Sequence, residues 1–153
     1  MKGTVKPETP RRPPLEEEAA FLDLVRTSEM LSRPLALLLK AEDLSPAQYN
    51  VLRILRGSPE GLTCGEIGSR MISRDPDITR LLDRMEKRKL VARGRDDKDR
   101  RVVLVRITPE GMGALARLDQ PIRDTHRRLL GHLGADRLRT LRELLEACRM
   151  PSA

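Results

Sequence analysis

Aromatic residues are almost absent from this chain of 153 residues, which contains Phe21, Tyr49 and no tryptophan. Proteins that bind RNA or single-stranded DNA usually stack the bases on exposed aromatic rings. The sequence therefore argues against a stacking platform for unpaired bases.

Cysteines and long apolar runs are also scarce. Cys64 and Cys148 are too few and too far apart for a disulfide framework, no apolar run is long enough to span a membrane, and the polar, proline-rich start does not resemble a signal peptide. His126 and His132 lack metal-ligand spacing, and there is no glycine-rich phosphate loop or nucleophile–base set. We expect a protein of the reducing cytoplasm that is not an enzyme and binds no membrane, metal or cofactor.

Positive charge is abundant and unevenly distributed. The chain has 30 Lys and Arg against 23 Asp and Glu, for a net charge of +7. The segment from Arg74 to Arg106 holds 12 basic and 7 acidic side chains, so it carries +5 of this excess. Such a local excess favours a polyanion, which gains affinity by releasing counterions. With so few aromatic residues, duplex DNA is the better candidate.

The chain divides into four segments by composition and periodicity. Residues 1–14 contain four prolines and predict a flexible basic arm. Residues 15–43 hold a long amphipathic helix that Pro34 should bend. We expect a compact domain over 44–108 and further helices over 109–153.

Three helix starts are visible within residues 44–108. Ser45 and Gln48 form one capping box around Pro46, and Thr63 and Glu66 form a second. Asp75 or Ser73 is expected to cap a third helix over about 76–88. The apolar positions of this helix recur at i, i+3, i+4 and i+7 and predict its buried face, which consists of Ile78, Leu81, Leu82 and Met85.

Two strand-like runs, 90–95 and 102–107, flank a highly charged turn and predict a β-hairpin. A helix should follow from Thr108 to about Leu133, interrupted by Pro121. A last helix is expected over 136–149.

This order predicts a mainly α fold with a small β-hairpin, a winged helix-turn-helix. In such folds the third helix lies in the major groove of DNA and the hairpin reaches an adjacent groove. We expect Arg80 to contact bases, Arg84 to contact phosphate, and Asp77 to be able to accept a hydrogen bond from a cytosine amine. Asp99 should orient a tip arginine, and an arginine at the tip can enter the minor groove. The expected DNA-binding residues are Ser73, Arg74, Asp77, Thr79, Arg80, Arg84, Asp99, Arg100 and Arg101.

The segments LSPAQYNVLRIL, TRLLDRMEKRKLVAR and DDKDRRVVLVRITPEG resemble the MarR family of bacterial transcriptional regulators over about residues 44–112. The resemblance implies a homodimer whose interface is formed by residues 15–41 and 109–149, bound to a palindromic duplex. It implies that Arg101 enters the minor groove, and that a small aromatic or anionic effector modulates binding. One departure is Lys89, which stands where the family usually has glycine.

Two other functions remain open at this point. A winged domain can serve as a protein-interaction module, although such a module has no need of paired tip arginines. Alternatively, Cys64 at the first position of a helix could be a redox sensor, because the helix dipole lowers the pKa of a thiol there.

Overall fold

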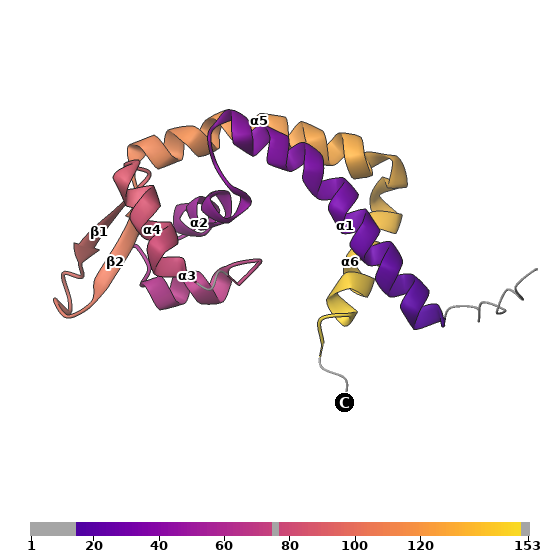
Figure 1. Ribbon diagram of the computed structural model, residues 1–153, viewed down its shortest axis with the longest axis horizontal. Helices are drawn as coiled ribbons and strands as arrows, with labels where there is room; N and C mark the ends of the chain where they lie inside the picture. The colour runs from indigo at the N-terminus through magenta and orange to yellow at the C-terminus, as the bar shows by residue number, and fades with distance from the viewer. Residues whose placement is uncertain (1–14, 75–76, 151–153) are drawn as a thin grey trace, which may run out of the picture. The chain divides into compact units, whose positions relative to one another are not determined.

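The computed structural model describes residues 15–74 and 77–150, which are mainly helical with one two-stranded antiparallel hairpin (Figure 1). This is the fold class that the sequence predicts. In chain order the elements are α1 (Glu16–Ala41), α2 (Pro46–Arg56), α3 (Cys64–Arg70), α4 (Ile78–Lys87), β1 (Val91–Arg95), β2 (Val103–Ile107), α5 (Pro109–Leu130), the 3-10 turn η1 (Gly131–Leu133) and α6 (Gly134–Ala147).

The chain divides into two compact units, of which the first ends at Ser32 and the second begins at Arg33. The described part of the first unit is the N-terminal portion of α1, and none of its described residues is buried. The second unit contains the rest of α1, helices α2 to α4, which form the helix-turn-helix, the hairpin of β1 and β2, which is the wing, and the C-terminal helices. The predicted arm over residues 1–14 lies outside the described residues.

Side-chain caps explain where the three short helices begin. The Ser45 and Thr63 capping boxes both form, as predicted, and start α2 and α3. The predicted cap of α4 was wrong for Ser73, and Asp75 lies outside the described residues. Asp77 is the N-cap instead, because its Oδ1 accepts the backbone N–H of Arg80 at 3.1 Å. The helix therefore starts at Ile78, later than expected.

The core of the second unit forms where α2, α3, α4 and α5 converge on the hairpin. The predicted inner face of α4 is confirmed at Leu81, Leu82 and Met85, which are at most 1% exposed, while Ile78 is half-buried. Each fully buried aliphatic side chain of this size contributes about 1.5 to 3 kcal/mol relative to an exposed one. The other fully buried side chains are Val51, Leu52, Leu55, Ile67, Val91, Val105 and Leu115.

The hairpin is confirmed, and each of its strands begins one residue later than predicted. Val91 pairs with Ile107 at its base and Arg95 pairs with Val103 toward its tip. Leu62, in the segment before α3, exchanges two backbone hydrogen bonds with Val105, at 3.0 and 2.8 Å. The wing is thereby attached to the helix-turn-helix by backbone bonds as well as by its buried side chains.

The C-terminal helices differ from the prediction in one main respect. The predicted interruption at Pro121 was wrong, because α5 continues through this residue to Leu130. A proline removes one backbone donor from a helix. Buried Leu118 and Ile122 on either side hold the surrounding turns against the core. After η1, α6 begins at Gly134, two residues earlier than expected.

The junction between α4 and β1 is a left-handed turn at Lys89, which has φ +58°. Lys89 N–H donates to the carbonyl of Glu86 at 2.8 Å and Leu90 N–H donates to that of Met85 at 3.0 Å. This is the Schellman arrangement that usually has glycine at the left-handed position. The chain therefore adopts a left-handed turn here in spite of its lysine, and a left-handed non-glycine residue costs about 1 to 2 kcal/mol.

We predict that Lys89→Gly stabilises the protein by about 0.5 kcal/mol, because relief of the left-handed strain exceeds the added entropy of the unfolded chain. Urea unfolding followed by circular dichroism measures the difference. Lys87→Gly is the matched control, since Lys87 is helical, and it should destabilise the protein by about 1 kcal/mol. Equal losses of stability in both variants would contradict the proposed strain.

Candidate nucleic-acid interface

Helix α4 has three sides that differ in what they contact. Leu81, Leu82 and Met85 are buried in the core. Asp83 and Glu86 lie on a second side, where both carboxylates face β1. The remaining side carries cations at i, i+4 and i+7, namely Arg80, Arg84 and Lys87, all of them exposed. Only this third side is available to a ligand as large as DNA.

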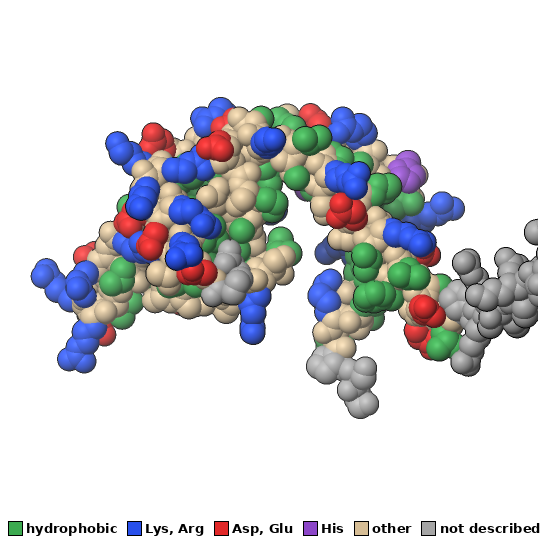
Figure 2. Space-filling view, in the orientation of Figure 1, with side chains coloured by type: hydrophobic (Ala, Val, Ile, Leu, Met, Phe, Trp, Pro, Cys, Tyr) green, Lys and Arg blue, Asp and Glu red, His purple; other side chains and the backbone are tan. Residues whose placement is uncertain are grey.

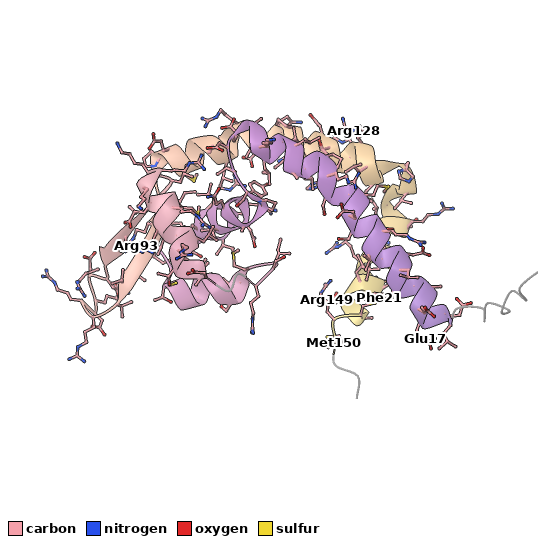
Figure 3. All side chains as sticks on the ribbon, viewed as in Figure 1. Glu17, Phe21, Arg93, Arg128, Arg149 and Met150 are labelled. Carbon is pink, nitrogen blue, oxygen red and sulfur yellow. The ribbon has the colours of Figure 1, made fainter. Side chains whose placement is uncertain are left out.

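Arg93 of β1 connects the wing to the second side of α4. Its Nη1 lies 2.7 Å from Asp83 Oδ1 and 2.8 Å from Glu86 Oε2, and its Nη2 donates to the carbonyl of Thr79 at 3.4 Å. Figure 3 labels this side chain where β1 meets α4. Burial would lower the pKa of the Arg93 guanidinium, but its hydrogen bonds to Asp83 and Glu86 outweigh burial and raise that pKa. The Arg93 guanidinium is therefore charged at any physiological pH. We call its contacts with Asp83 and Glu86 the Arg93 clamp.

The sequence prediction missed Arg93. It treated the charges of this region as one basic excess, although Asp83 and Glu86 at i, i+3 share one edge of a helix. Two acidic residues at this spacing, followed by an arginine in the next strand, are the signal that indicates such a clamp.

The exposed cations of α4 differ in whether they have a partner. Arg80 Nε lies 3.4 Å from Asp77 Oδ2, so this arginine is paired with the helix cap. Among the described residues, the side chains of Arg84 and Lys87 have no hydrogen-bonding or ionic partner. Figure 2 shows Lys and Arg side chains gathered over α4 and the wing. Arg84, for which the sequence predicts a phosphate contact, thus has an exposed charge without a partner among the described residues.

The wing tip is organised by its own backbone contacts. Asp99 Oδ1 accepts the N–H of Arg101 at 3.0 Å, and Arg95 Nη1 donates to the carbonyl of Arg100 at 2.8 Å. Val102 N–H donates to the carbonyl of Asp99 at 2.9 Å. The side chains of Arg100 and Arg101 are exposed and, within the part of the chain that is described, have no partner. Asp99 therefore fixes the backbone of Arg101, while the guanidinium groups of Arg100 and Arg101 stay available to a ligand.

The other predicted contact residues occupy the beginning of α4 and the segment before it. Ser73 and Arg74 are exposed and precede the helix. Thr79 is exposed, and its Oγ1 lies 3.8 Å from Cys64 Sγ in α3. The structure thus places Thr79, Arg80 and Arg84 on one short helix with Asp77 as its N-cap, and Asp99, Arg100 and Arg101 on the neighbouring wing. That these residues contact DNA stays a prediction, as does redox sensing at Cys64.

Two features typical of other classes of function are absent from the described residues. No group of three or more His, Cys, Asp or Glu side chains is arranged to hold a metal ion over 15–74 and 77–150. No helix in the described ranges has the length and apolar character needed to cross a membrane. Both cysteines are free thiols, and Cys64 is half-buried whereas Cys148 is exposed.

The MarR family model matches residues 42–102, which hold the helix-turn-helix, β1 and the turn of the hairpin. Among solved structures, a MarR transcription factor from Planctomyces limnophilus is 41% identical, with 90% of this chain and 99% of that chain covered and a TM-score of 0.65. A cysteine-to-serine mutant of MarR from E. coli, solved in complex with operator DNA, is 27% identical, with coverages of 88% and 96% and a TM-score of 0.78.

A third solved structure is similar and contains a ligand. It is the PcaV transcriptional regulator from Streptomyces coelicolor in complex with its natural ligand, which is 28% identical. The match covers 79% of this chain and 87% of that chain, with a TM-score of 0.66.

We predict that Arg93→Ala destabilises the protein by about 1 to 2 kcal/mol, because two half-exposed carboxylates lose their shared partner. Thermal or urea unfolding measures this loss. Arg100→Ala is the matched control, since it removes the same charge from the same hairpin but breaks no ion pair, and should leave stability unchanged. If the two variants unfold alike, Arg93 does not act as a clamp.

Proposed function

Because this chain belongs to the MarR family of transcriptional regulators, we propose that it binds duplex DNA of defined sequence as a homodimer and thereby regulates transcription. The observation that carries the proposal is the exposed cationic side of α4, on which Arg84 and Lys87 have no partner among the described residues, beside a wing with two exposed tip arginines. The E. coli MarR mutant solved with operator DNA supports it, since that protein has the same fold over nearly its whole length.

In the proposed complex, α4 lies in the major groove and the wing tip reaches an adjacent minor groove. Arg84 contacts a phosphate, and Arg101 enters the minor groove, where the negative potential attracts arginine. Arg93 contributes indirectly, because it fixes the wing against α4 and so fixes the separation of the two contacts. Ser73, Arg74 and Arg100 lie at the edges of this surface and add phosphate contacts.

The proposed dimer would cover apolar side chains that the single chain exposes. Phe21 and Val25 of α1 are 64% and 50% exposed, and Leu144 of α6 is 60% exposed. Such large apolar side chains favour burial against a partner surface. A second copy of the chain is the proposed partner, and two copies would place two α4 helices on half-sites about 34 Å apart.

We also propose that a small aromatic or anionic effector modulates DNA binding. The PcaV structure with its natural ligand supports this part of the proposal. An effector acts by binding one arrangement of the dimer more tightly than another, so it would shift the spacing of the two reading helices away from that of the half-sites. We propose neither a catalytic role nor a bound cofactor, and we place the protein in the cytoplasm with the chromosome.

We predict that Arg84→Ala weakens binding similarly for all duplex sequences and reduces the slope of log affinity against log salt by about 1, as expected for one lost phosphate contact. Arg101→Ala should lower affinity most for sites with a narrow minor groove. Fluorescence anisotropy titrations at several salt concentrations measure both effects. Arg53→Ala, which removes an exposed arginine of α2 outside the proposed DNA and dimer contacts, is the control, and an equal loss of affinity in that variant would reduce the effect to net charge.

We predict that Phe21→Glu converts the dimer to a monomer at micromolar concentration, because a carboxylate cannot be buried unpaired in an apolar interface. Light scattering coupled to size-exclusion chromatography reports the mass. Phe21→Leu keeps the apolar character and should remain dimeric. A wild-type protein that is itself monomeric would refute the dimeric part of the proposal.

A further inference from the structure

Asp77, the N-cap residue of α4, contacts Arg80 at two points. Asp77 Oδ1 accepts the backbone N–H of Arg80 at 3.1 Å, and Asp77 Oδ2 lies 3.4 Å from Arg80 Nε. The aspartate therefore caps the helix and restrains a side chain one turn later. Both side chains remain largely exposed, at 53% for Asp77 and 75% for Arg80.

The position of the Asp77 carboxylate determines which donors of Arg80 remain available to a ligand. The carboxylate lies beside Nε of the guanidinium, so the terminal Nη1 and Nη2 donors remain available. A pair of arginine donors matches the O6 and N7 acceptors that guanine presents in the major groove. Arginine loses considerable side-chain freedom when it is ordered, and a guanidinium that is held in advance loses less on binding.

Charge distinguishes Arg80 from the other cations of α4. Together Asp77 and Arg80 are close to neutral, and the carboxylate would be repelled by a phosphate. Arg84 and Lys87 have no such partner among the described residues, which suits them to phosphate. Asp83 and Glu86 both face Arg93, whose single positive charge offsets part of theirs and turns them away from the cationic side. A paired arginine with two free donors is better suited to a base edge than to the DNA backbone.

We propose that Asp77 is a positioning residue that holds Arg80 for bidentate recognition of one guanine in each half-site. The inference rests on the proposed function and adds to it a base identity and a role for the carboxylate. It also reassigns Asp77, for which the sequence suggested a hydrogen bond from cytosine: its two oxygens serve Arg80 instead.

The variant that separates positioning from capping is Asp77→Ser. Serine caps a helix about as well as aspartate, so the unfolding midpoint should be unchanged. Simple electrostatics predicts that loss of an acidic group raises affinity for every duplex alike. Positioning predicts that affinity for unrelated duplexes rises while discrimination for the preferred site falls. Arg80→Lys keeps the charge but lacks the paired donors, and should lose the same discrimination.

The experiment first selects a preferred duplex for the wild-type protein from a random-sequence library. Each guanine is then replaced singly by 7-deazaguanine, which lacks the N7 acceptor, or by inosine, which keeps O6 and N7. We expect one guanine per half-site at which 7-deazaguanine, but not inosine, weakens wild-type binding about tenfold. This penalty should fall to about threefold in Asp77→Ser and nearly vanish in Arg80→Lys.

Arg84→Ala is the matched control, because it should weaken binding to all duplexes yet retain the full 7-deazaguanine penalty. An unchanged penalty in Asp77→Ser or in Arg80→Lys, or the absence of any penalised guanine, would overturn the inference while leaving the proposed function intact. Failure of the wild-type protein to enrich any duplex would instead refute the proposed function itself.

Discussion

The rotational setting of α4 about its own axis is the constraint on which the rest of the structure depends. Burial of Leu81, Leu82 and Met85 fixes one side of the helix in the core, and Arg93 holds a second side through Asp83 and Glu86. With two of its sides fixed, α4 can present only the side that carries Arg80 and Arg84. Because Arg93 belongs to β1, the same contacts set the position of the wing, so both parts of the proposed DNA surface depend on one clamp.

The start of α5 is joined to the same region through backbone contacts. Thr108 N–H donates to the carbonyl of Leu90 at 3.1 Å, and its hydroxyl donates to that of Lys89. A Cβ at Gly111 would collide with the Leu90 carbonyl, so glycine permits this close approach. Farther along α5, Arg117 pairs with Glu42 at 2.8 Å, and hydrogen bonding to this arginine lowers the pKa of the Glu42 carboxyl. Through the contacts of Thr108 and Gly111, displacement of α5 would be transmitted to the junction of α4 and the wing, which is the coupling that the proposed control by an effector needs.

Local rules predicted most of the fold, and long-range contacts account for what they missed. The Ser45 and Thr63 capping boxes and the charged turn of the hairpin are properties of a few neighbouring residues, so the sequence placed them correctly. Pro121 was misjudged because the packing of Leu118 and Ile122 outweighs one lost hydrogen bond. The candidate site likewise combines local features with long-range contacts. Its exposed arginines could be predicted from periodicity, but the Arg93 clamp joins β1 to α4 and can be recognised only in the folded chain.

The same reasoning explains why net charge is a poor guide to individual roles. A count over residues 74–106 treats its basic side chains as equivalent, but the folded chain sorts them by their carboxylate partners. Arg93 contacts two carboxylates and serves the fold, whereas Arg80 contacts one and keeps two donors free. The side chains of Arg84, Arg100 and Arg101 contact no carboxylate among the described residues and retain their full charge toward solvent. The acidic residues of the segment therefore do not merely dilute a basic surface. In the proposed complex, they determine which arginine supports the helix, which is held for a base and which remain available for the phosphate backbone or the minor groove.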